Sequence, residues 1–172
     1  MIAINEREFA RLLGYPWGTA LAGEVLDRAH QARQWYSSNG RPRVYSRVVA
    51  AETVAAVTAG GEVEEEVDRL WKLGRVDEAY FLDRFAAAVV EQLASDLAFY
   101  RSPGTAGVPF EEQFRLYALL APLSPEIEIL SSGMLKPRNS LLALAAPSAA
   151  MRGNPCVRCG LRDCTFRRRA AR

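Results

Sequence analysis

Apolar residues recur every three or four positions through much of the chain, which is the spacing of one buried helix face. This spacing predicts helices over residues 5–13, 19–36, 61–73, 77–99 and 110–120. Asn5 and Glu8 have the spacing of a helix-capping pair, and we expect Thr19 to cap the second helix. Gly60-Gly61 precedes the third helix, and Gly74 ends it.

Strand-forming residues fall between these helices. Runs rich in β-branched and apolar residues predict strands over 44–49, 53–58, 126–130 and 141–145. Helices and strands do not alternate regularly along the chain, so their order favours an α+β fold with an antiparallel sheet of mixed order packed with several helices. We assign this domain to residues 1–150 and a short basic tail to residues 151–172.

Length and composition limit the class of protein. The chain has 172 residues, of which 49% are hydrophobic and 24% are charged, and this is typical of one globular domain with its own core. It contains no apolar run of the roughly 20 residues that a membrane-spanning helix needs. The first residues lack a basic segment followed by an apolar one, as a secretory signal would have. We therefore expect a cytoplasmic protein that has no membrane partner.

The tail holds all three cysteines of the chain, Cys156, Cys159 and Cys164. The Cys-x2-Cys spacing lets two sulfur atoms bind one ion, and Gly160 allows the turn that returns Cys164 to them. In the cytoplasm such a group is typical of metal-binding or redox-active cysteines rather than of a disulfide framework. A closed zinc site or a four-cysteine iron–sulfur cluster needs one ligand more than these three thiolates.

Several groups are candidates for the fourth ligand. Asp163, a water molecule and a group from a partner protein all remain open. His30 is the only histidine and lies on the predicted 19–36 helix. It is the less favoured candidate, because a lone histidine on a helix is more often a surface or half-buried residue.

Charge is distributed unevenly. Residues 152–172 contain seven arginines and one aspartate, so they carry +6 while the rest of the chain carries −4 of the net +2. The acidic residues of the third predicted helix are Glu62, Glu64, Glu65, Glu66 and Asp68. A basic tail suits either contact with an acidic partner or a solubilising role. No nucleic-acid-binding motif or interleaved aromatic residues favour nucleic acid as that partner.

Two features of the domain offer candidate chemistry. Glu91 lies at the border of the apolar stripe of the 77–99 helix, where a carboxylate either reaches solvent or serves a buried cation, and the spacing favours solvent. The 101–109 loop contains two prolines and two glycines, so it cannot continue a helix. Its backbone N–H groups and the Arg101 guanidinium suit a carboxylate or a phosphate. Without other evidence, a loop of this composition is more often a tight turn between two elements than an anion-binding site.

Four segments of the chain stand in a characteristic order. They are residues 74–86 with Glu91 beyond them, residues 101–109 followed by Glu111-Glu112-Gln113, residues 127–140, and the Cys-x2-Cys-x4-Cys-x-Phe-Arg tail. In this order they resemble the reactivation domain of cobalamin-dependent methionine synthase, in its short stand-alone form. The opening helix is also similar to that of the family, and the match covers most of the chain.

The resemblance implies a function. Domains of this family bind S-adenosylmethionine and support the reductive methylation that restores an oxidised, inactive corrinoid. We therefore expect an accessory component of a cobalamin-dependent methyltransferase, without turnover of its own. The corrinoid would be carried by a partner methyltransferase or corrinoid protein, and an electron-donor protein would supply the reduction.

The resemblance also assigns ligand-binding residues. Glu91 would meet the positively charged or amino end of S-adenosylmethionine, and Arg101 would hold its carboxylate. The loop residues expected around the ligand are Gly104, Thr105, Ala106, Gly107 and Pro109, whose small members let the backbone approach closely. Thr105 stands where the family has a tyrosine, Arg101 lies one residue closer to Gly104 than the family arginine does, and the late aromatic residues of the pocket have no counterpart.

These departures leave a second function open. The chain would then be a metal-binding accessory or adaptor protein that keeps the fold and has lost S-adenosylmethionine binding. Cys156, Cys159 and Cys164 would hold zinc or an iron–sulfur cluster in that protein.

Overall fold

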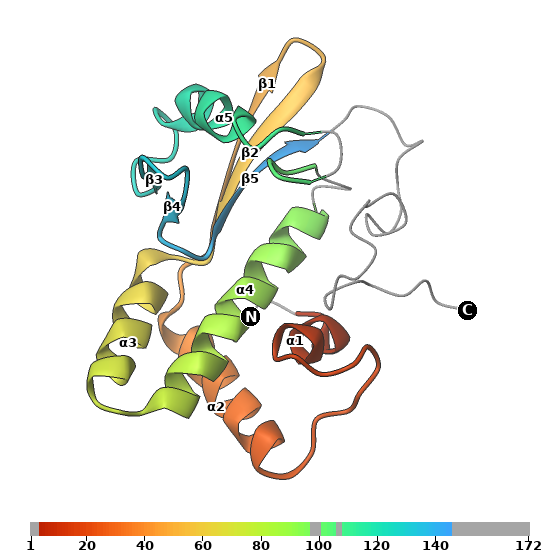
Figure 1. Cartoon of the computed structure of the whole chain (residues 1–172), viewed down its shortest axis with the longest axis vertical. Helices are drawn as coiled ribbons and strands as arrows, with labels where there is room; N and C mark the ends of the chain where they lie inside the picture. The colour runs from red at the N-terminus through yellow and green to blue at the C-terminus, as the bar shows by residue number, and fades with distance from the viewer. Residues whose placement is uncertain (1–3, 97–100, 106–107, 146–172) are drawn as a thin grey trace.

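The computed structural model describes residues 4–96, 101–105 and 108–145, and its helices α1–α4 gather at one end while the sheet and α5 lie at the other (Figure 1). The elements are α1 (Glu6–Leu12), α2 (Gly23–Asn39), β1 (Arg43–Val49), β2 (Glu52–Thr58), α3 (Gly61–Lys72), α4 (Val76–Asp96), α5 (Glu112–Leu120), β3 (Glu128–Ile129), β4 (Leu135–Lys136) and β5 (Ser140–Ala145). In this part of the chain, no helix has the length and apolar character needed to cross a membrane.

The long helix α4 is the centre of the helical end. Its buried residues Leu82, Ala86 and Val89 recur at three- and four-residue spacing and so share one face. Phe85 on the same helix packs edge-on against Phe9 of α1, with ring centroids 5.4 Å apart and an interplanar angle of 81°. α4 also packs against α2 and α3, so three helices depend on it for their apolar contacts.

The main sheet is antiparallel and has the order β1-β2-β5. β1 and β2 form a tight hairpin that closes with Val49 opposite Glu52, and β5 pairs with the other edge of β2 from Ser140 opposite Thr58 to Ala145 opposite Thr53. A second apolar core lies between this sheet and α5, and its most buried members are Val54, Ala56, Leu116, Leu120, Ile127 and Leu142.

A set of polar contacts joins the helical end to the sheet. Ala59, which follows β2, donates its N–H to the carbonyl of Asn139 at 3.0 Å. The Tyr36 hydroxyl of α2 donates to the Ala59 carbonyl at 2.7 Å. The Asn139 amide donates to Asp83 of α4 at 2.9 Å. The end of β2 and the start of β5 are therefore held from two helices at once.

The predicted fold class is confirmed at this level, because the described residues form an α+β structure with an antiparallel sheet. The prediction for the start of the second helix is wrong: α2 begins at Gly23, its cap position is Ala22, and no side chain caps it. The strand predicted over 126–130 is shortened to β3, which pairs only with the unpredicted β4. Residues 146–172 lie outside the described residues, so the boundary of the tail is not placed.

Candidate functional site

The 101–109 loop starts from a fixed point at the edge of the sheet. Arg101 donates its N–H to the carbonyl of Leu144 in β5 at 2.9 Å, and Leu144 donates back to the Arg101 carbonyl at 2.8 Å. These two bonds form an isolated antiparallel bridge between Arg101 and β5. The Arg101 side chain therefore projects from a main chain that is held by the sheet.

Beyond Arg101 the loop is closed by its own hydrogen bonds. Gly104 donates its N–H to Val108 at 3.0 Å, and Thr105 donates both its N–H and its hydroxyl to the Ser102 carbonyl, at 3.1 and 2.6 Å. Gly104 has a φ of 82°, which favours glycine over other residues. The N–H groups of Gly104 and Thr105 are thus already used inside the loop. Pro109 is exposed and has no N–H to offer.

The Arg101 guanidinium is only partly satisfied. Its Nη2 atom donates to Glu52 of β2 at 3.3 Å, and the two side chains are 34% and 43% exposed. Its Nε atom is buried and has no hydrogen-bond partner in the described structure. Leaving a donor of a charged group buried without an acceptor costs free energy. A carboxylate placed at this point would satisfy that donor and would suit the guanidinium fork.

Glu91 lies on α4, between the buried residues Val90 and Ala94. Its side chain is half-buried, which agrees with the predicted position at the border of the apolar face. Its carbonyl accepts a hydrogen bond from the Ser95 hydroxyl at 2.7 Å. Ala106 and Gly107, the two other predicted loop residues, lie outside the described residues.

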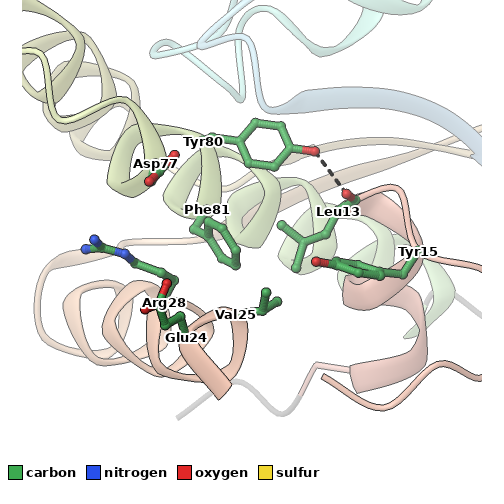
Figure 2. Close-up of a pocket in the computed structure, with 8 residues that line it drawn as sticks. All are labelled: Leu13, Tyr15, Glu24, Val25, Arg28, Asp77, Tyr80 and Phe81. Atoms are coloured by element: carbon green, nitrogen blue, oxygen red, sulfur yellow. Dashed lines mark hydrogen bonds between the residues drawn. The ribbon is translucent and has the colours of Figure 1, made fainter. Parts of the chain in front are cut away.

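A groove that sequence reasoning missed lies between α1, α2 and α4 (Figure 2). It encloses about 240 Å³ and is lined by Leu13, Tyr15, Glu24, Val25, Arg28, Asp77, Tyr80 and Phe81. Figure 2 shows Phe81 and Val25 facing each other across it, with the Tyr15 hydroxyl turned inward, and the Tyr80 hydroxyl donates to the Leu13 carbonyl at 3.2 Å. These residues come from three separate segments, so no local motif could have identified them.

A second groove, of about 580 Å³, lies between α2, α3 and α4 and shares Arg28 with the first. Three arginines and two glutamates line it, and each glutamate is paired with an arginine. A hydrogen bond from Arg69 holds the pKa of Glu66 below its usual value, and one from Arg75 lowers the pKa of Glu78 in the same way. These two arginines already bind carboxylates, and the remaining Arg28 lies 3.8 Å from Glu78, so the lining keeps one positive charge in excess. None of the predicted ligand residues lines either groove.

The proposed metal ligands lie outside the part of the chain that can be described. Cys156, Cys159 and Cys164 belong to residues 146–172. Within the described residues, no group of three or more histidine, cysteine, aspartate or glutamate side chains is placed to hold a metal ion. His30 is exposed on α2.

Three of the segments that carry the family resemblance are in contact with one another. Asp83 of the first accepts the Asn139 hydrogen bond from the third. Gln113, which follows the 101–109 loop, donates to the Gly133 carbonyl in the third segment at 2.8 Å. The sequence alone assigns no role to these residues, and their contacts show that the third segment ties the other two together.

Comparison with known proteins gives no independent assignment, since no family model matches the chain and no curated protein does.

Proposed function

We propose that this protein binds S-adenosylmethionine at the 101–109 loop and supports reductive methylation of a corrinoid on a partner methyltransferase. The chain would supply the methyl donor, a donor protein would supply one electron, and the partner would carry the cobalt, so the protein would have no turnover alone. The proposal rests on the family resemblance together with one structural observation, which is the state of Arg101.

Three properties of Arg101 suit it to binding the carboxylate of a ligand. Its backbone is fixed by β5, its side chain is one-third exposed, and its buried Nε atom has no acceptor in the described structure. Its existing partner, Glu52, is itself 43% exposed. Exposed ion pairs contribute little free energy, so a ligand carboxylate can replace Glu52 at small cost. Glu91, on the half-buried border of α4, would meet the amino end of the ligand.

Calorimetry with S-adenosylmethionine on the purified full chain tests the proposal. We expect binding by the unmodified protein, and we expect Arg101→Gln to weaken it by about 10- to 100-fold, the equivalent of one charge-assisted hydrogen bond. Arg115→Gln is the matched control, because Arg115 pairs with Glu112 on the exposed side of α5 and should not affect the affinity. Lack of binding at millimolar ligand, or equal loss in both variants, would contradict the proposal.

The spacing of Cys156, Cys159 and Cys164 supports a second candidate function, that of a metal-binding accessory protein. Metal analysis after anaerobic purification tests it. Stoichiometric zinc in a colourless protein would indicate a structural site, and iron with sulfide in a coloured protein would indicate a cluster. Retention of metal without S-adenosylmethionine binding would favour this candidate over the first.

A further inference from the structure

β1 is an outer strand of the main sheet. In the described structure it pairs with β2 alone, and the hairpin that it forms with β2 projects beyond the other elements at the top of Figure 1. Val44 and Val48 on this strand are 41% and 72% exposed. An edge strand with exposed apolar side chains is a template for pairing with another strand unless charged residues guard it.

The charged residues of β1 are turned away from these valines. The Arg47 guanidinium donates a hydrogen bond to the Leu119 carbonyl of α5 at 3.5 Å. Nη1 of Arg43 lies 3.8 Å from Oε1 of Glu126. Successive side chains of a strand point to opposite faces, so both arginines lie on the face that α5 covers. Val44 and Val48 lie on the other face, where neither arginine shields them.

The outward backbone groups can be assigned from the hairpin. Its loop has two residues, since Val49 lies opposite Glu52, and Ala50 has a φ of 54°, as the first loop residue of a type II′ turn does. In such a turn the two residues that flank the loop, here Val49 and Glu52, are joined by backbone hydrogen bonds. Along an antiparallel strand, the backbone N–H and C=O groups of successive residues point alternately toward one neighbouring strand and the other. Since Val49 bonds to β2, Val44, Ser46 and Val48 direct their N–H and C=O groups away from β2, to the outer edge of the sheet.

We propose that β1 pairs with β1 of a second copy of this chain, in antiparallel orientation about a two-fold axis at Ser46. The two three-stranded sheets then form one continuous sheet. In this arrangement Val44 lies opposite Val48 of the second copy, which brings the exposed apolar side chains of the two copies into contact. Arg47 lies opposite Tyr45 of the second copy, a favourable pairing of a cation with an aromatic ring.

The charge pattern of β1 is what favours a second copy in this register. An axis at Ser46 places Arg43 opposite Val49 and Arg47 opposite Tyr45, so no two arginines meet. An axis at Tyr45 would place Arg43 opposite Arg47, and an axis at Arg47 would place Arg47 opposite itself. Like charges directly opposite each other destabilise a strand pair. Of these three central registers, only the one at Ser46 is complementary.

Light scattering of the full chain across a wide concentration range tests the association. We expect a dimer of twice the 19.0 kDa chain mass. Ser46→Pro removes an outward N–H and Val48→Lys places a charge in the apolar pair, so each should raise the dimer dissociation constant at least about tenfold. Leu73→Lys is the matched control, because Leu73 is 59% exposed at the turn between α3 and α4, and it should dimerise like the unmodified chain.

Cross-linking tests the register. Ser46 residues of the two copies would meet with Cα atoms about 5.5 Å apart, which is within disulfide range, so Ser46→Cys should give a 46–46 linked peptide on mild oxidation. Val44→Cys should not, since Val44 of the second copy lies four positions along the strand. A monomer at every concentration would overturn the proposal. So would a dimer that Val48→Lys leaves unchanged, or equal cross-linking by Val44→Cys.

Discussion

At the scale of single residues, Asn5 caps the start of α1 and Glu8 pairs with Arg11 within the helix. Asn5 caps the helix as predicted, since its side chain accepts hydrogen bonds from the N–H groups of Arg7 and Glu8 at 3.0 and 3.3 Å. The Glu8 carboxylate accepts two hydrogen bonds from the Arg11 guanidinium, of 2.9 and 3.2 Å. A two-bond pair with a guanidinium is stronger than a single bond to a backbone N–H.

The Glu8–Arg11 pair gives a test at the same scale. Both residues are buried, at 6% and 7% exposure, so Glu8→Ala or Arg11→Ala removes one side of an ion pair from the interior. We expect each single change to lower the free energy of unfolding by about 3 kcal/mol, and the double variant Glu8→Leu/Arg11→Met to lose less. Urea denaturation measures all three. Single changes that each cost under about 1 kcal/mol would show that the pair behaves as a surface pair.

At the scale of elements, the α3–α4 pair combines a buried apolar face with ion pairs at its solvent side. Val63, Val67 and Leu70 of α3 are buried at the spacing of one helix face. On the outer side, Arg69 binds Glu66 at 2.7 Å and Arg75 binds Glu78 at 2.7 Å. The apolar face fixes the packing of the helices, and the ion pairs make the stability of this region sensitive to pH.

The direction of that sensitivity follows from the lowered pKa values. In the folded protein the pKa of Glu66 lies below its usual value of 4.5, chiefly because the Arg69 side chain donates a hydrogen bond to it. The pair therefore stabilises the fold above pH 4.5, and this stabilisation is lost as the pH falls through the lowered pKa. Denaturation of the unmodified protein and Glu66→Gln should show a stability difference at neutral pH that disappears on acidification. Glu65→Gln, at an exposed position of α3, is the control. A difference that grows in acid would contradict the assignment.

At the scale of the whole molecule, the sequence was sufficient to predict the helices and strands that have a regular apolar pattern. α3, α4, β1, β2 and β5 fall close to their predicted ranges because their apolar spacing is regular. The start of α2 was misplaced because Thr19 looks like a cap, whereas the helix begins after Ala22 without one. β4 is two residues long, and its pairing with β3 depends on tertiary contact rather than on alternation.

The candidate site was predictable only as a list of residues. The loop composition identified Arg101, but its bond to Glu52 and its buried Nε atom depend on β2 and on pairing with Leu144, far away in sequence. The same holds for the link between Asp83 and Asn139. Contacts across such sequence distances leave no periodic signal, so only the structure could reveal them.

Hydrogen–deuterium exchange with and without S-adenosylmethionine tests the central claim at this scale, because it reports where on the molecule the ligand acts. We predict that the ligand slows exchange in peptides covering the 101–109 loop and the Glu91 turn of α4. Peptides covering Tyr15 and Arg28, which line the grooves, should exchange at the same rate with and without the ligand. Unchanged exchange at millimolar ligand, or protection at Tyr15 and Arg28 with none at the loop, would contradict the account.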